Sequence, residues 1–294
     1  MMPNSTPAQE LTIKPHRIPI RAFRFLSRGN HRLMVMLRGF CDASGQSDDP
    51  KDLFVTLGGV VSDLDSWEKF ELLWGQMLRD FEVSELHMAD LNQLIGEYTG
   101  WDVPKREKFL GCALKIMDTH CAGYIGASMP VEVFQDLTDE HQRKLVDPYF
   151  PCFFVNISGL MTCADHLSAD EKVEMVLDDD TGMKGKAENF WEKTKVEGPA
   201  EVRERLGTIT AGACSRYVFP LQAADLVAHE INRFNTSEYL HEKDGTPFPK
   251  NWPRWPFKQL FDSGKLLTYD LLNRRNSKKW FGVSFRSSFL KPGP

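Results

Sequence analysis

The sequence lacks any run of 18–20 apolar residues, the length that a membrane-spanning helix needs. Its longest apolar runs are interrupted, as in residues 148–161 (PYFPCFFVNISGLM). It also lacks a Pro/Gly/Ser-rich linker within residues 34–290 and any internal repeat of 20–50 residues. We therefore expect one domain over residues 34–290 and no membrane partner.

The sequence has no C-x-x-C pair and no secretory signal, because residues 1–33 contain no apolar core of about 7–15 residues. These absences favour a cytoplasmic protein with reduced thiols. Cys112, His120 and Cys121 lack the second ligand pair of a structural zinc site, so zinc is disfavoured. The six cysteines are Cys41, Cys112, Cys121, Cys152, Cys163 and Cys214.

Several catalytic motifs are missing too. No G-x-x-x-x-G-K-[ST], G-x-G-x-x-G or G-x-S-x-G occurs, which removes support for nucleotide-fuelled and serine-nucleophile chemistry. Residues 178–183 (DDDTGM) come close to three other motifs and match none. There is no second D-[ST]-G for an aspartic protease. Gly182 replaces the Thr of a phosphatase box, and Met183 replaces the Gly of a calcium loop.

Charge is unevenly distributed along the 294 residues. The chain has 36 Lys+Arg against 41 Asp+Glu, a net charge of −5. Residues 1–38 hold seven basic residues and only Glu10, a net of +6, so the remainder carries −11. An acidic body does not coat nucleic acid through bulk charge, so any polyanion must bind at a local site. Residues 1–33 are expected to be a basic, disordered leader or to precede the true start at Met34 or Met36, with a transit peptide as the alternative.

Apolar periodicity predicts strands that alternate with helices after an opening hairpin. This order predicts an α/β fold with a mixed, mostly parallel sheet and helices on both faces. Strands are predicted at 34–41, 53–61, 122–128, 173–177 and 206–211. Helices are predicted at 64–81, 103–119, 186–196 and 221–234, with a mostly helical stretch over 130–168 and an ordered loop over 245–257.

Acidic residues stand where apolar strands end. Asp42 follows the first strand, and Asp178, Asp179 and Asp180 follow the strand 173–177. Asp225 interrupts an apolar helix, and Glu85 lies close to His87. Sites in open α/β sheets form at strand ends, and confined carboxylates repel one another unless a cation neutralises them. Such oxygen ligands suit Mg²⁺ or Mn²⁺, and two ions about 3.5–4 Å apart can activate water against a phosphodiester.

Each of these residues also has an ordinary structural explanation. Asp42 could start a turn, the three consecutive aspartates could cap a helix or face water, and Asp225 could pair with a basic residue. Glu85 and His87 could be plain loop residues, and Gln222 a capping side chain. Sequence spacing leaves these alternatives open.

Five short segments occur in order along the chain: F-C-D-A-S-G, L-G-G-V-V, S-E-L-H, V-L-D-D and L-Q-A-A-D-L-V-A. This ordered set, over roughly residues 36–235, resembles the domain of unknown function 3800 family, which is similar to the ribonuclease-H-like superfamily. The resemblance implies a ribonuclease-H-like fold, a carboxylate-bound metal site and nuclease activity. The family's D-E-S-G becomes D-A-S-G here, so Ala43 removes one carboxylate and leaves Asp42 and Ser44 in place.

The leading hypothesis is a Mg²⁺- or Mn²⁺-dependent nuclease acting on RNA or DNA. The proposed metal ligands are Asp42, Asp178 (or Asp179) and Asp225, with Glu85 as a fourth catalytic carboxylate. His87 would position water or product, Gln222 would orient a ligand or contact substrate, and Ser44 would support Asp42. Phosphate contacts are expected from the leader, Lys184, Lys186 and the basic cluster 274–279. The alternatives are an inactive ribonuclease-H-like binding module and a hydrolase of another phosphate ester.

Overall fold

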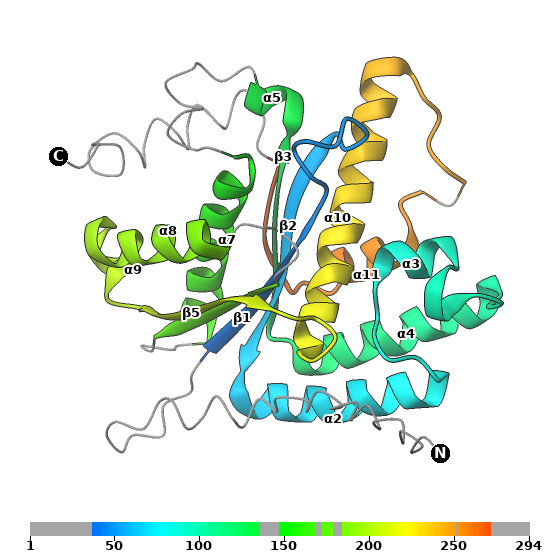
Figure 1. The fold of residues 1–294 in the computed structure, drawn as a ribbon, viewed down its shortest axis with the longest axis horizontal. Helices are drawn as coiled ribbons and strands as arrows, with labels where there is room; N and C mark the ends of the chain where they lie inside the picture. Colours follow the sequence, from blue (N-terminus) through cyan, green and yellow to red (C-terminus); the bar gives the residue numbers. More distant parts are fainter. Residues whose placement is uncertain (1–36, 136–146, 168–171, 179–183, 251, 272–294) are drawn as a thin grey trace, which may run out of the picture.

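The computed structural model describes residues 37–135, 147–167, 172–178, 184–250 and 252–271. In this part of the chain six strands form one sheet in the order β5-β4-β1-β2-β3-β6 (Figure 1). The strands are β1 (Leu37–Ser44), β2 (Phe54–Asp63), β3 (Gly123–Pro130), β4 (Val173–Asp178), β5 (Leu206–Ala213) and β6 (Leu266–Leu271).

The sheet is mixed. Strand β2 runs antiparallel to both of its neighbours, β1 and β3, so the predicted opening hairpin is confirmed. Strands β4 and β5 continue parallel to β1, and β6 lies parallel to β3 at the other edge. The order β3-β2-β1-β4-β5 with only β2 reversed is the topology of the ribonuclease-H-like fold. The predicted fold class is therefore confirmed.

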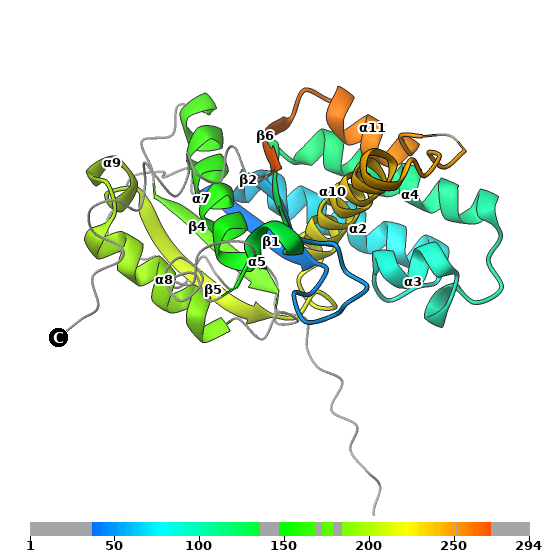
Figure 2. The same cartoon turned by 90° about the horizontal axis from the view of Figure 1, so that it is seen from above.

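Helices cover both faces of the sheet (Figure 2). One face carries α7 (Tyr149–His166) and α8 (Lys184–Glu197), whose apolar side chains share a core with β1, β4 and β5. The other carries α2 (Leu64–Phe81), α3 (Met88–Gln93), α4 (Val103–His120), α10 (Phe219–Asp244) and α11 (Trp255–Asp262). Three short helices complete the described part: α5 (Val131–Gln135), η2 (Gly96–Tyr98) and α9 (Ala200–Arg203). No helix within the described residues is long and apolar enough to cross a membrane.

Local sequence explains α2, whose bounds match the prediction. Asp63 caps its start by accepting a hydrogen bond from the backbone N–H of Ser66, and Glu82 ends it in the left-handed conformation. The helix buries Trp67, Phe70 and Trp74, spaced three and four residues apart, against the sheet.

Helix α10 lies against the hairpin at unusually close range. A Cβ atom added to Gly58 would lie 2.3 Å from the backbone nitrogen of Ala228, so only glycine permits this approach. One turn further on, Asn232 Nδ2 donates to the carbonyls of Ser44 (2.9 Å) and Phe54 (3.2 Å). These contacts fix the distance between α10 and the hairpin and also the position of the helix along the hairpin.

Several elements differ from the sequence prediction. Strand β1 continues through Asp42 to Ser44, because these residues pair with Gly58 to Thr56 of β2. Helix α10 runs ten residues beyond its predicted end and stops at Gly245, which has a positive φ. The predicted loop 245–257 contains the start of α11, and α3 and β6 were not predicted. The predicted leader, residues 136–146 and the cluster 274–279 lie outside the described residues.

We predict that Gly58→Ala lowers the free energy of unfolding by about 2–3 kcal/mol, because the new methyl group meets helix backbone that cannot rotate away. Gly111→Ala is the matched control. Gly111 lies in α4 with open space around its Cα, so alanine there should stabilise by about 0.5–1 kcal/mol. Urea unfolding followed by circular dichroism measures both. Equal effects of the two substitutions would contradict the close packing of α10.

Candidate active site

Asp42 and Asp178 lie side by side at the carboxyl ends of parallel strands. The last register pair between β1 and β4 is Cys41 with Leu177, and the two aspartates are the next residues on each strand. Neighbouring strands are about 4.8 Å apart, so the two backbones are one strand spacing from each other. Asp42 and Asp178 are only 8% and 5% exposed.

Both aspartates point toward the face that α10 covers. Side chains alternate along a strand, and two residues earlier Phe40 and Val176 pack in the core that contains α10. The intervening Cys41 and Leu177 pack in the opposite core with α7. Asp42 Oδ1 accepts a hydrogen bond from the backbone N–H of Ala43 at 2.7 Å, which orients that carboxylate.

Asp225 approaches the same face from α10. Ala228 contacts Gly58, which is the register partner of Asp42, and Asp225 lies one turn earlier, roughly 4.5 Å along the helix axis. Its Oδ2 accepts a hydrogen bond of 2.7 Å from the backbone N–H of Met88, and the residue is 9% exposed. The fold thus brings three buried carboxylates, distant in sequence, to one face and one edge of the sheet.

A cleft of about 840 Å³ opens beside these residues. One wall is the end of β1 and the turn that follows it, residues 43–49, which includes Ser44. The facing wall contains His87, Asp225 and His229. Tyr149, at the start of α7, also lines the cleft. A substrate in this cleft would lie against Asp225 and next to the residues that follow Asp42.

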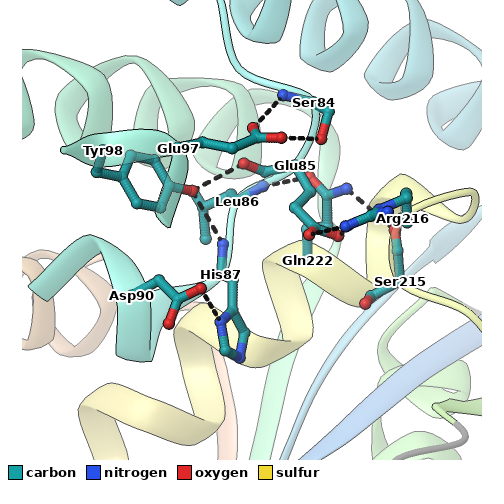
Figure 3. A network of polar contacts seen from close by, with 10 residues as sticks. All are labelled: Ser84, Glu85, Leu86, His87, Asp90, Glu97, Tyr98, Ser215, Arg216 and Gln222. Carbon is teal, nitrogen blue, oxygen red and sulfur yellow. Dashed lines mark hydrogen bonds and ion pairs between the residues drawn. The ribbon is translucent and has the colours of Figure 1, made fainter. Parts of the chain in front are cut away.

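Gln222 is a structural clamp between two segments (Figure 3). Its Oε1 accepts hydrogen bonds from Trp74 Nε1 (2.8 Å) and the Leu86 backbone N–H (2.9 Å), and its Nε2 donates to the Ser215 carbonyl (3.0 Å). The residue is fully buried. These three contacts are all to protein groups, and the predicted role of Gln222 toward a ligand or substrate stays a prediction. Gln222 positions residues 84–87.

Glu85 is engaged in an ion pair with Arg216. The closest approach, between Arg216 Nη2 and Glu85 Oε1, is 2.8 Å. The backbone carbonyl of Glu85 accepts a hydrogen bond from Tyr98 Oη at 2.8 Å. The described structure thus gives the Glu85 carboxylate a basic partner, and its role as a fourth metal ligand stays a prediction.

The two histidines of the cleft are in opposite electrostatic surroundings. Burial lowers the pKa of His87, but the carboxylates of Asp225 and Asp90 outweigh it, and the pKa is raised. Asp90 Oδ2 lies 3.2 Å from Nδ1 of His87. Burial lowers the pKa of His229 to about 3, with a smaller contribution from nearby arginines. Asn92 Nδ2 lies 2.7 Å from His229 Nε2 and, as a donor, fixes that nitrogen as the acceptor of a neutral ring.

The donor chemistry of the three aspartates fits a hard divalent cation, because Mg²⁺ and Mn²⁺ prefer carboxylate oxygens. Within the described ranges, however, no three His, Cys, Asp or Glu side chains form a group that could hold a metal ion. Asp225 binds the Met88 N–H with one oxygen, which shows that its carboxylate is directed partly toward α3. Asp179 lies outside the described residues. The carboxylates share a face, but the described ones do not form a closed ligand set.

Three residues of the site were missed by the sequence analysis: His229, Tyr149 and Arg216. His229 had a readable signal, since it lies four residues after Asp225 and so shares its helix face. Tyr149 and Arg216 reach the site through tertiary packing and had no local signal. Of the predicted phosphate contacts, Lys186 lies exposed on α8, whereas the leader, the side chain of Lys184 and the cluster 274–279 are outside the described part of the chain.

No family model matches the chain, and neither does any curated protein. Eight chains of solved structures do match. One of them is ribonuclease H2 from Pyrococcus horikoshii OT3, which is 12% identical with a TM-score of 0.32. That match covers 84% of this chain and 89% of the ribonuclease chain. The resemblance to the domain of unknown function 3800 family remains a prediction.

We predict that His229 stays neutral down to about pH 4, while His87 gains its proton at a higher pH than an unperturbed histidine does. In the unfolded chain His229 binds a proton near pH 6.5, whereas in the folded chain it does so only near pH 3. The contribution of His229 to the free energy of unfolding therefore falls as the pH drops from about 6.5 toward 3. Imidazole NMR titration of the metal-free protein measures both rings. His229→Gln should make stability less dependent on pH in that window. Titration of His229 near pH 6.5 would contradict the described burial.

We predict that Gln222→Ala destabilises the fold by about 2–4 kcal/mol, because Trp74, Leu86 and Ser215 each lose a buried hydrogen-bond partner. Gln76→Ala, on the exposed face of α2, is the control and should change stability by less than about 0.5 kcal/mol. Denaturant unfolding measures both. A Gln222→Ala protein as stable as the control would show that the clamp is dispensable.

Proposed function

We propose that this protein is a Mg²⁺- or Mn²⁺-dependent nuclease that hydrolyses phosphodiester bonds of RNA or DNA. One observation carries the proposal. Asp42 on β1 and Asp178 on β4 each directly follow the last β1–β4 register pair, on the face that Asp225 approaches from α10. Carboxylates at one edge of a sheet repel one another, and a divalent cation bound there would relieve that repulsion.

Asp42, Asp178 and Asp225 would hold the metal ions, with Asp179 as a further candidate. When bound, the metal would activate water and stabilise the leaving oxygen of a phosphodiester. The Met88 N–H orients Asp225, and the low exposure of all three carboxylates limits access of bulk water. His87, held by Asp90 at the cleft wall, would position water or product.

Within the described residues, the cleft lining contains five aspartates and no Lys or Arg, so a polyanion would bind there together with metal ions. Its wall contains His87, whose pKa is raised, and metal ions would neutralise the aspartates. Binding would therefore depend on this local site and not on the overall charge, in agreement with the net charge of −5. The polymer would lie along the cleft between the β1–β2 turn and α10.

We predict that the purified chain cleaves RNA, DNA or their hybrid with Mg²⁺ or Mn²⁺, and that Asp42→Asn, Asp178→Asn and Asp225→Asn each reduce the rate by at least about 100-fold. Asp80→Asn, an exposed residue near the end of α2, is the matched control and should cleave like the wild type. Labelled single strands, duplexes and hybrids, resolved on gels, provide the measurement. Cleavage by none of the preparations, or equal cleavage by all, would overturn the proposal.

An inactive binding module is the second candidate. Ala43 in place of the family's Glu favours it, as does the lack of a closed ligand set among the described residues. Calorimetric titration with Mn²⁺ separates the two functions. A nuclease binds Mn²⁺ with an affinity that Asp42→Asn lowers, whereas a module binds oligonucleotide without binding the ion.

A further inference from the structure

The ion pair of Arg216 and Glu85 is solvent-accessible and bidentate. Arg216 Nη2 lies 2.8 Å from Glu85 Oε1, and its Nε lies 3.4 Å from Oε2. The side chains are 54% and 24% exposed, so the guanidinium is open to a ligand on its outer side. Arg216 belongs to the loop between β5 and α10, and Figure 3 shows it reaching toward Glu85.

This pair links two segments that lead to proposed metal ligands. Ala213, at the end of β5, is the register partner of Asp178, and Arg216 follows three residues later. Glu85 lies three residues before Met88, whose N–H holds Asp225. The pair therefore links the loop that follows β5, the neighbour of β4, with the segment that leads to Met88.

Both backbones that carry the pair are held firmly by buried groups. Gln222 binds Leu86 and Ser215, the immediate neighbours of Glu85 and Arg216, with one side chain. Tyr98 Oη donates to the Glu85 carbonyl and accepts from the His87 N–H at 3.2 Å. An exposed ion pair contributes little to folding stability by itself. The buried hydrogen bonds on both sides of the pair therefore fix the backbones of Glu85 and Arg216 more firmly than the ion pair itself does.

We propose that Arg216 binds a backbone phosphate of the nucleic-acid substrate, and that Glu85 is a positioning residue that holds the guanidinium ready for it. This inference rests on the proposed nuclease function. A guanidinium carries five N–H donors, of which Glu85 occupies two, so others remain for phosphate oxygens in the planar geometry that Arg recognises. Glu85 then acts through Arg216 and not as a metal ligand.

The test measures binding apart from cleavage. Fluorescence anisotropy of the full chain with labelled 20-nucleotide RNA and DNA strands, in EDTA and over a range of salt concentrations, gives affinity and salt slope. Arg216→Ala should weaken binding about tenfold at 0.15 M salt and reduce the slope of log K against log salt by about 1. Arg216→Lys should keep the slope and recover only part of the affinity. Lys243→Ala, which removes a similarly exposed ion pair with Glu132, is the control and should bind like the wild type.

Glu85→Gln separates the two roles of the carboxylate. A positioning residue leaves calorimetric Mn²⁺ affinity unchanged and raises KM for cleavage more than it lowers kcat. Loss of Mn²⁺ binding in Glu85→Gln, equal to that in Asp42→Asn, would make Glu85 a ligand and overturn the inference.

Failure of this inference differs from failure of the nuclease function. A wild-type chain that cleaves, together with an Arg216→Ala chain of unchanged affinity and salt slope, overturns the role of Arg216 alone. A wild-type chain that binds both strands through Arg216 without cleaving them overturns the nuclease function alone. A wild-type chain that binds neither strand overturns the phosphate-binding role. Circular dichroism confirms that each exposed substitution leaves the fold intact.

Discussion

The close approach of α10 to the β1–β2 hairpin is the constraint on which the candidate site depends. It is possible because Gly58 has no side chain where the backbone of Ala228 meets the sheet. Asn232 then fixes the helix lengthwise by bonding the carbonyls of Ser44 and Phe54. With the helix so placed, Asp225 has to lie on the face to which Asp42 points. A bulkier residue at position 58 would move a carboxylate as well as loosen the core.

Side chains of α10 also hold backbone groups of neighbouring segments in place. Gln222 anchors residues 84–87 and the loop after β5, and Asp225 anchors the start of α3 through Met88. These segments have little regular structure of their own, so their backbone groups need partners from elsewhere. One helix thus supplies a proposed ligand and also holds the segments that carry His87, Glu85 and Arg216.

The electrostatics of the site follow from differences in burial over a short distance. Burial and nearby arginines lower the pKa of the partly buried His229, whereas neighbouring carboxylates raise the pKa of the half-exposed His87. The half-exposed ring of His87 and the accessible guanidinium of Arg216 are donors of the kind that a phosphate oxygen accepts from. The carboxylates of the site suit a divalent cation and its basic groups suit an anion, in agreement with the proposed function.

Local patterns determined much of the fold. Apolar alternation and helical spacing identified β1, β2, α2 and α4, and the acids at strand ends identified Asp42 and Asp178, because these signals lie within a few neighbouring residues. Helix α11 and strand β6 were missed, as was the pairing of Glu85 with Arg216, 131 residues away. Sequence alone thus determined which residues could form a site at the sheet edge. Only the tertiary structure decided that Gln222 is a buried clamp and that Arg216 faces Glu85, because those partners are set by how α10 packs and not by any local spacing.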